Sequence, residues 1–541
     1  MIKNWKIVLY CLIIVVAILA VYMPVTRLFF QQDEWLGYGL SLVKGRGMIL
    51  QSTGGVWGII LGQGRIFTNV LLYLFHNFFP RNILPVAVFA ISLHITNSLL
   101  VFYLTGKLFK SSLMAFFAGL FFAVNSVSQN AVTWMAASVN TLPSTALILI
   151  SLVFYFKYLE SDKPKWLITT FALVYLSLFF KETGIFLLLF LPVSTLIFKK
   201  YSLKKFIYTY WYFFLSSLTI VVFRLLQFKL TPNPDALFLT GATSNYWAVL
   251  LTRVLFYPLT SFSLVFVPSE PFLWFARLFT LAYYPFPSSP TTILIAQTAV
   301  LDLLAVCLSG IILILIGFFI KLSSSLEKKH ISFFCIFLLV NYLPFTVVSK
   351  SFSYLESRYY YLSSVAAGVI LAWLLFSVYR KIKIFYIKPV IILFFLLFMA
   401  WHVKYINDGL KRDVETASER KNFIYQLMTS VPSLDQNINV FYFNSDSDYY
   451  IAGNKVPFQE GMGYTLMTLY YNGGKIPADL LRDSYLFEIG GNGYSQVGNY
   501  GFGYFTDKEK LELTIKANKL NKSKVYSFYY NSKTKTLSMT E

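Results

Sequence analysis

Two adjacent carboxylates, Asp33 and Glu34, follow the first apolar segment of the sequence and are flanked by aromatic residues. Carboxylates are costly near the apolar interior of a membrane, so a pair at its edge needs a reason. One reason is an ordinary solvated loop. The other is an acid–base site, in which a carboxylate accepts the proton of an attacking hydroxyl group. The remainder of the sequence favours the acid–base site.

Cationic residues in three later segments complete this chemistry. They are Arg65, Lys181 next to Glu182, and Arg358, which follows Glu356. Cations stabilise the charge that grows on a departing phosphate, and arginine holds two phosphate oxygens with its planar fork. Solvation explains each charge taken singly. Together, a carboxylate and these cations are what group transfer from a phosphate ester requires.

The composition indicates a polytopic membrane protein. Of the 541 residues, 57% are hydrophobic and only 13% are charged, against about 25% charged in soluble proteins. The net charge of +21 is typical of lysine and arginine gathered in cytoplasmic loops, so we expect no nucleic-acid partner. Residues 1–25 resemble a signal peptide or an uncleaved anchor, and their length favours the anchor. The three cysteines lie in apolar runs and predict neither disulfides nor a thiolate metal site.

Eleven apolar segments are near the length of a membrane-spanning helix. Residues 229–290 are apolar but broken by prolines, and could add two crossings or interfacial helices. The predicted fold is therefore an all-α polytopic bundle of about 11–13 helices. The eleven segments are 7–25, 83–105, 112–128, 141–158, 166–180, 184–198, 206–228, 293–320, 331–348, 359–379 and 386–403.

Lysine clusters predict the topology, because they fall on one side if the helices alternate, and that side is the cytoplasm. The N-terminus is then inside, and the carboxylates and cations above lie outside, in a multi-pass protein of the cytoplasmic membrane. Residues 166–198 as one helix would be roughly 50 Å long, well beyond the ~30 Å hydrocarbon core. We therefore expect a hairpin with Lys181 and Glu182 at its outer tip.

The polar tail predicts a second domain, so we divide the chain into a transmembrane module over 1–403 and a soluble, extracytoplasmic α+β domain over 404–541. Short alternating runs at 438–443 and 525–530 predict strands, the second opening a hairpin. Thr506 to Glu509 has the pattern of a capping box that begins a helix ending near Asn518. The Gly- and Tyr-rich residues 453–505 are expected to form loops.

Three polar residues lie inside or beside these helices. His94 and Asn97 are three residues apart and share a helix face, which is explained either by helix–helix hydrogen bonds or by substrate contact. Trp134 falls in the outer loop 125–140.

The sequence resembles the C-type (GT-C) superfamily of membrane glycosyltransferases, and within it the bacterial relatives of protein O-mannosyltransferases. The resemblance covers about residues 1–370 and leaves the tail unassigned. Five stretches carry it: Gln32-Asp33-Glu34, Gly64-Arg65-Ile66-Phe67-Thr68-Asn69, Leu93-His94-Ile95-Thr96-Asn97-Ser98-Leu99-Leu100, Leu178-Phe179-Phe180-Lys181-Glu182-Thr183-Gly184, and Glu356-Ser357-Arg358-Tyr359-Tyr360-Tyr361-Leu362-Ser363-Ser364.

The resemblance implies an enzyme that moves a sugar from a polyprenyl-phosphate carrier to an acceptor hydroxyl of a protein, lipid or surface glycan, with inversion. It places the base on Asp33, with Glu34 as its neighbour in the site. Lys181, Arg358 and, less strongly, Arg65 would bind the carrier phosphate. Supporting or substrate-contacting residues would be Glu182, Tyr361, His94, Asn97 and Trp134. No cofactor is implied. Asp33, Glu34 and Glu182 could form an oxygen site for a divalent metal, but no D-x-D or histidine cluster supports one.

The sequence departs from this family at three positions, where Asn130, Ser138 and Asn140 replace charged residues that relatives often carry around the loop tryptophan. These side chains can bind a sugar by hydrogen bonds but supply no charge, so the sugar and the acceptor stay open. Two other classes remain as alternatives: a lipid or glycan transporter or flippase, and an O-antigen ligase or polymerase. Transporters place charge near mid-membrane, whereas ligases rely on a large outer loop rich in arginine and histidine.

Overall fold

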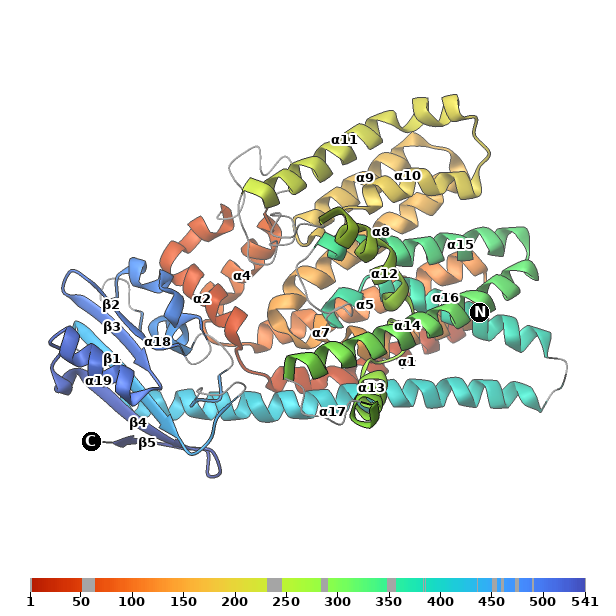
Figure 1. Cartoon of the computed structure of the whole chain (residues 1–541). Coiled ribbons are helices and arrows are strands. Elements are labelled where there is room, and N and C mark those ends of the chain that lie inside the picture. Colours follow the sequence, from red (N-terminus) through yellow and green to blue (C-terminus); the bar gives the residue numbers. More distant parts are fainter. Residues whose placement is uncertain are drawn as a thin grey trace. The chain divides into compact units, whose positions relative to one another are not determined.

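The computed structural model is largely helical and has one small sheet near the C-terminus (Figure 1). It describes residues 2–50, 64–230, 246–283, 290–347, 357–382, 384, 386–434, 436–449, 455–458, 462–471, 476–488 and 491–540.

Eight of the described helices are long and apolar enough to cross a membrane, or nine if one bent pair counts as a span. A helix of 20 residues already covers the ~30 Å of a hydrocarbon core, so these helices are compatible with a multi-pass membrane protein. The eight are α1 (Ile2–Tyr22), α5 (Leu84–Phe109), α8 (Met135–Ser161), α11 (Leu203–Leu230), α14 (Pro290–Lys321), α15 (Ser325–Val340) together with the residues that follow it to Thr346, α16 (Ser363–Lys381) and α17 (Ile387–Ser430).

Each of the eleven predicted segments contains a helix, but three of them are short or bent. The bent pair is α6 (Ser112–Val124) with the residues 126–133 that hold α7 (Asn130–Thr133), and it turns by 42°. The other two are α9 (Pro164–Leu178) and α10 (Leu187–Phe198), of 15 and 12 residues. They rise only about 22 and 18 Å, so helix length alone does not make them spans.

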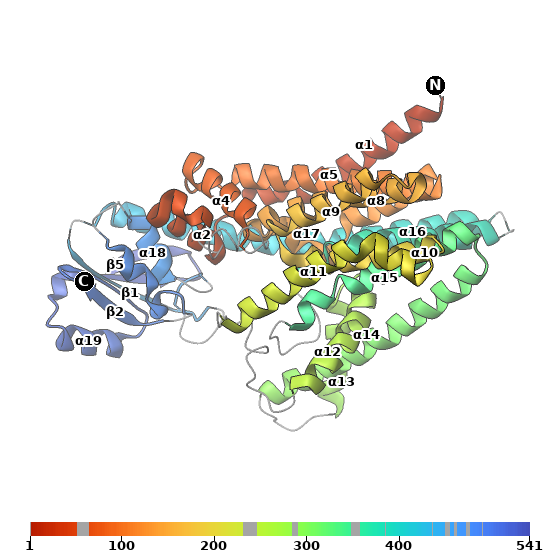
Figure 2. The ribbon, with the colours of Figure 1, turned by 90° about the horizontal axis from the view of Figure 1, so that it is seen from above.

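Two further helices, α12 (Tyr246–Leu264) and α13 (Glu270–Tyr283), lie in the proline-broken region 229–290. Some contacts in the bundle join helices that are neighbours in sequence, as where α9 runs along α8 (Figures 1 and 2). Others join helices far apart in sequence, as where α16 packs on α6.

The chain folds as two compact units, each packed mainly on itself. The first comprises Met1–Met23, Ser52–Thr68 and Phe89–Asn407. The second comprises Pro24–Gln51, Asn69–Val88 and Asp408–Glu541. The second unit therefore joins two N-terminal stretches to the C-terminal region, which the sequence-based division at residue 403 did not anticipate.

Helix α17 continues 27 residues beyond the apolar segment predicted to end at 403. Its polar half is amphipathic, and it buries one face through Leu410, Ala417, Phe423 and Leu427. Phe423 packs against Phe443 and Tyr530 of the sheet, with ring centroids 5.6 and 5.2 Å apart. The change from an apolar to a polar composition thus marks no end of the helix.

The sheet of the second unit has the strand order β2-β3-β1-β4-β5 (Figure 1). The central β1 is parallel to β3 and β4, while β2 and β5 pair antiparallel at the edges. Its strands are β1 (Ile438–Ser445), β2 (Gly493–Val497), β3 (Tyr500–Phe505), β4 (Val525–Asn531) and β5 (Thr536–Thr540). The central strand β1 lies in the core, since Val440, Phe441 and Phe443 are fully buried.

The predicted strands at 438–443 and 525–530 are confirmed, as is the hairpin from β4 to β5. Asn531 Oδ1 makes its turn by accepting from the backbone N–H groups of Lys533 and Thr534. The helix near 507 is also confirmed, as α19 (Lys508–Ala517), but its cap is Asp507 and not Thr506. Asp507 accepts from Glu509 N and Lys510 N, while Thr506 N donates to Asn492.

Some elements were missed from the sequence. The region expected to form loops holds the β2–β3 hairpin and α18 (Met462–Tyr470). These elements were missed because the many glycines of the region are typical of turns. In the N-terminal stretches, α2 (Gln32–Lys44) and α4 (Ile66–Phe78) replace the expected outer loop.

Helices α2 and α18 pack closely, and Gly39 permits this. A Cβ atom built on Gly39 would lie 2.7 Å from Thr468 Oγ1 and 2.9 Å from Tyr464 Cε1. We expect Gly39→Ala to destabilise the second unit by about 1–3 kcal/mol through overpacking, measured as a lower thermal unfolding midpoint. Gly47→Ala is the matched control, since its nearest contact would be 4.0 Å away. Equal midpoints for both variants would show that α18 can move aside.

Candidate functional site

Lys181 and Glu182 lie where the apolar hairpin is interrupted, as predicted. Helix α9 ends at Leu178, a short 3-10 turn covers Glu182–Gly184, and α10 begins at Leu187. Lys181 itself has extended backbone angles, φ −158° and ψ 143°, so its side chain leaves the helical path. The break therefore directs two charged side chains away from the two apolar helices.

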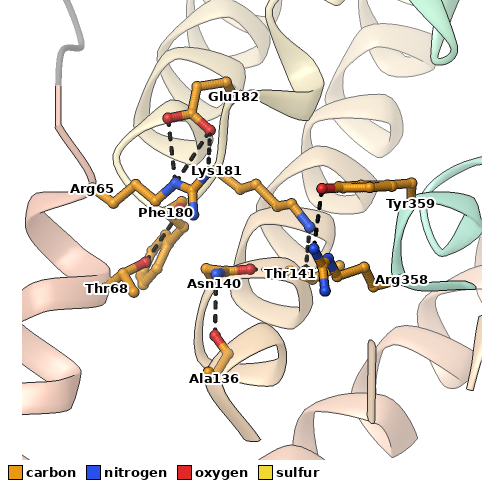
Figure 3. Close-up of polar contacts among 10 residues, drawn as sticks. All are labelled: Arg65, Thr68, Ala136, Asn140, Thr141, Phe180, Lys181, Glu182, Arg358 and Tyr359. Atoms are coloured by element: carbon orange, nitrogen blue, oxygen red, sulfur yellow. Dashed lines mark hydrogen bonds and ion pairs between the residues drawn. The ribbon is translucent and has the colours of Figure 1, made fainter. Parts of the chain in front are cut away.

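Glu182 forms an ion pair with Arg65 (Figure 3). Arg65 Nε lies 3.3 and 3.2 Å from the two carboxylate oxygens, and Nη2 lies 3.0 Å from Oε2. The Glu182 charge raises the pKa of Arg65. Nearby, Thr68 Oγ1 donates to Phe180 O at 3.0 Å and Phe67 N donates to Phe179 O at 3.2 Å. Arg65 thus anchors the connector through Glu182, while its predicted contact with a phosphate stays a prediction.

Lys181 is buried, with 5% of its surface exposed. Its Nζ donates to Thr141 Oγ1 at 2.7 Å, and Thr141 in turn donates to Asn140 Oδ1 at 2.9 Å (Figure 3). The Nζ atom also lies 5.3 Å from the centre of the Tyr359 ring. Within the described part of the chain, no carboxylate lies within ion-pair distance of this ammonium group.

The pKa of Lys181 lies well below its usual value. Burial is the main cause, and the charges of Arg65 and Arg358 lower it further, while Glu182 opposes them. A buried cation is costly unless it is paired. An anion bound at Nζ would therefore stabilise the charged form and gain strongly from the low-dielectric surroundings.

Arg358 lies beside two aromatic rings. Its Cζ is 4.1 Å from the centre of the Trp134 ring and 5.0 Å from that of Tyr359, and Nη2 donates to Tyr359 Oη at 3.2 Å. Contact with aromatic faces helps to hold a guanidinium group in place. Trp134 Nε1 is itself buried and has no hydrogen-bond partner among the described residues.

These elements come from four segments of the first unit: residues 65–68, the start of α8, the connector 179–186 and residues 357–361. Asn130 N donates to Ser357 Oγ at 3.2 Å, which joins α7 to the turn that carries Arg358. The result is a cationic cluster of Lys181, Arg358 and Arg65, in which Glu182 pairs with Arg65. This arrangement suits an anion, and its aromatic walls suit the apolar or sugar part of a ligand.

Replacing Thr141 with valine tests the support of Lys181. Valine keeps the volume but removes the acceptor at 2.7 Å, and a hydrogen bond to a charged group contributes about 1.5–3 kcal/mol. We expect Thr141→Val to weaken anion binding at Lys181. It should also lower the pH above which that binding is lost, because the ammonium form of Lys181 loses its acceptor. Thr145→Val is the control, because Thr145 Oγ1 donates to the Thr141 carbonyl and not to the Lys181 side chain. Equal affinities in both variants would remove Thr141 from the site.

His94, Asn97 and Tyr361 form a buried network, each at most 1% exposed. Tyr361 Oη lies 2.8 Å from His94 Nδ1 and accepts from Asn97 Nδ2 at 3.2 Å. His94 Nε2 lies 2.9 Å from the Ala123 carbonyl, so Nε2 carries the proton and Nδ1 accepts from the tyrosine. The contacts are helix–helix hydrogen bonds, one of the two explanations drawn from the sequence. They join α5 to the segment that follows Arg358.

Asp33 and Glu34 belong to the second unit and lie in the first turn of α2. Glu34 is 5% exposed, and its Oε2 accepts from Gln31 N at 2.9 Å as part of a capping box. Asp33 is exposed. The two carboxylates therefore differ, because one caps a helix while the other faces solvent. The Gln31-x-x-Glu34 spacing carries the capping signal, which sequence reasoning overlooked.

Other residues were placed differently or missed. Thr141 and Tyr359 were not predicted, since only folding brings them to Lys181 and Arg358. Ser138 is fully buried and donates to Met135 O, and Asn140 binds Ala136 O and Thr141. Glu356, one of the predicted outer charges, lies outside the described residues.

No group of three or more His, Cys, Asp or Glu side chains that could hold a metal ion occurs within the described ranges. Comparison with protein-family models yields no match to this chain, and neither does a search of curated proteins.

Proposed function

We propose that this protein is an integral membrane glycosyltransferase. It would transfer a sugar from a polyprenyl-phosphate carrier to an acceptor hydroxyl at the outer face of the membrane. One observation carries the proposal: the ammonium group of Lys181 is buried beside Arg358 and Arg65 with no carboxylate partner in the described structure. A site of this kind favours an anion, and the apolar helices on either side of Lys181 favour an anion attached to a lipid.

Lys181 and Arg358 would bind the phosphate in this proposal. As the bond between the anomeric carbon and the phosphate oxygen breaks, negative charge grows on the departing phosphate, and the two cations stabilise it. Trp134 and Tyr359 hold the plane of Arg358. Arg65 and Glu182 hold the connector from which Lys181 extends. Arginine at position 358 suits two phosphate oxygens better than lysine would.

Asp33 would act as the base, an assignment that rests on the sequence resemblance and on its exposure at the start of α2. The acceptor oxygen attacks the anomeric carbon, the acceptor proton passes to the Asp33 carboxylate, and the polyprenyl phosphate leaves. One displacement without a covalent sugar–enzyme step inverts the anomeric configuration. Glu34 would support this role through its capping contact with Gln31.

The orientation can be measured by cysteine labelling, in a variant whose three native cysteines are replaced by serine. We expect Asn444→Cys, exposed on β1, to react with a membrane-impermeant maleimide in intact cells. Lys204→Cys, exposed at the start of α11, should react only after permeabilisation, because basic clusters favour the cytoplasm. The reverse pattern would place the cationic cluster on the wrong face for this proposal.

The activity is tested by incubating purified protein in lipid nanodiscs with a panel of polyprenyl-phosphate sugars and cell-envelope extract. Mass spectrometry then shows which carrier loses its sugar and where the sugar appears. Transfer that depends on Lys181 supports the proposal. Tight binding of a polyprenyl phosphate without any loss of sugar, together with its movement between leaflets of a liposome, would instead identify a transporter.

A further inference from the structure

The second unit contains a groove along α2. The cavity has a volume of about 340 Å³, and α2 contributes Leu36, Leu40, Val43 and Lys44 to its lining. These positions recur at helical spacing, and Asp33 stands three residues before Leu36, so all of them share one face of the helix. Asp33 is exposed at the start of this stripe, and Lys44 is exposed at its end.

The opposite wall comes from the C-terminal part of the same unit. It comprises Tyr464 of α18, Leu481 and Arg482 at the end of the turn Ala478–Arg482, and Phe487. Tyr464 and Phe487 are in contact, with ring centroids 4.7 Å apart. The walls are therefore aliphatic and aromatic, and they leave room for an apolar group.

Two cationic side chains, Lys44 and Arg482, line the groove. Lys44 forms none of the ion pairs found in the described structure, and Arg482 lies 3.9 Å from Asp479 with both side chains more than 70% exposed. Exposed pairs of this kind contribute little and are readily exchanged. An acidic group that reaches these side chains would meet two cations and one carboxylate.

We propose that this groove recognises the acceptor, and that the acceptor is an acidic polypeptide segment. A serine or threonine hydroxyl would lie at Asp33, an apolar side chain two residues away would enter the groove, and an acidic side chain four residues away would meet Lys44 and Arg482. This inference rests on the proposed function, because it assigns the reacting hydroxyl to Asp33.

The geometry favours a polypeptide over other acceptors. Asp33 and Lys44 are eleven residues apart, or about 16 Å along the helix axis. Four residues of an extended chain span about 13–14 Å, and their alternate side chains point the same way. The reach of the lysine and acidic side chains covers the remainder. A glycolipid carries its hydroxyls and its anionic group together at one end, and a glycan lacks the aliphatic group that Leu36, Leu40 and Val43 would contact.

The test uses the full-length protein in nanodiscs and three fluorescent peptides with a central threonine. The first has leucine two residues and aspartate four residues after the threonine. The second carries asparagine in place of the aspartate, and the third carries lysine. Anisotropy measured without donor reports binding alone, and transfer assays with donor report KM and kcat. The variant is Lys44→Glu with Arg482→Glu, and the matched control is Lys516→Glu, which reverses an exposed charge on α19.

We expect the acidic peptide to bind about tenfold more tightly than the asparagine peptide, as two favourable surface charge contacts would give. The variant with both charges reversed should show a higher KM for the acidic peptide with kcat unchanged, and it should bind the lysine peptide more tightly than the acidic one. Lys516→Glu should behave as wild type. Leu40→Asn should weaken binding of all three peptides.

The outcomes separate the two proposals. If sugar passes to a lipid or glycan while the peptides neither bind nor react, the groove inference is wrong and the glycosyltransferase proposal stands. Equal binding of the three peptides by wild type and by the double variant also overturns it. If the acidic peptide binds with the predicted preference but no carrier loses its sugar, the groove binds peptides and the proposed function fails.

Discussion

Replacing Asp33 with asparagine is expected to lower sugar transfer by about 10²- to 10⁴-fold, the usual contribution of a general base. Asparagine keeps the size and shape of aspartate but cannot accept the proton of the attacking hydroxyl. The loss should appear in turnover at saturating donor, with donor affinity nearly unchanged, because the proton transfer occurs only in the transition state. The measurement is the single-turnover transfer rate beside a direct donor-binding assay.

Glu34→Gln is the matched control for this change. Glutamine also serves in a capping box, so it can retain the contact with Gln31 N that Glu34 makes at 2.9 Å. We expect a mild effect on turnover and on the unfolding midpoint. If Glu34→Gln abolishes turnover and Asp33→Asn does not, the two roles are exchanged. If both variants turn over normally, this helix start carries no base.

Replacing Lys181 with alanine is expected to weaken donor use by about 2–4 kcal/mol, the range for loss of one key electrostatic donor, or roughly 30- to 1,000-fold in kcat/KM. The protein should remain folded, since removing a buried cation that lacks a carboxylate partner leaves no charge stranded. Arg358→Lys should retain part of the activity, because it keeps a charge but loses both the fork and the stacking on Trp134. Wild-type kinetics in the folded Lys181→Ala variant would remove Lys181 from the site.

The lowered pKa of Lys181 gives this site a pH dependence whose sign can be stated. Without a bound anion, Lys181 holds the ammonium form only below that lowered pKa, and a phosphate requires the ammonium form. Affinity for the polyprenyl-phosphate sugar, a phosphodiester whose single negative charge does not change with pH, should therefore be highest at low pH and fall as pH rises through the pKa of Lys181 in the anion-free protein. Binding should take up a proton, which calorimetry in buffers of different ionisation enthalpy measures.

Lys181→Arg provides the control for this pH dependence, since arginine stays charged throughout. Its affinity should vary less with pH, below the ordinary pKa of lysine, than that of the wild type. The neighbouring charges of Arg65, Arg358 and Glu182 remain in both proteins. An identical pH profile for the two proteins would assign the titration to another group.

Much of the bundle could be predicted from the sequence, because apolar runs and lysine clusters are local properties of the chain. The runs placed a helix in each of the eleven segments. The break at Lys181 and Glu182 was predicted because one helix over 166–198 would be longer than the hydrocarbon core is thick. The same kind of local signal, alternation of apolar residues, located strands β1 and β4. These features depend on near neighbours in sequence, so they can be predicted without knowledge of the fold.

The partners of the candidate site residues were decided by tertiary structure. Arg65 and Glu182 are 117 residues apart, and no spacing rule predicts that they form an ion pair. Thr141 became the acceptor for Lys181, and Trp134 became the aromatic face under Arg358, because α8 packs against α9 and the turn at 357–360 packs against α7. The sign of each charge is evident from the sequence. Its pairing and its burial depend on segments that only folding brings together.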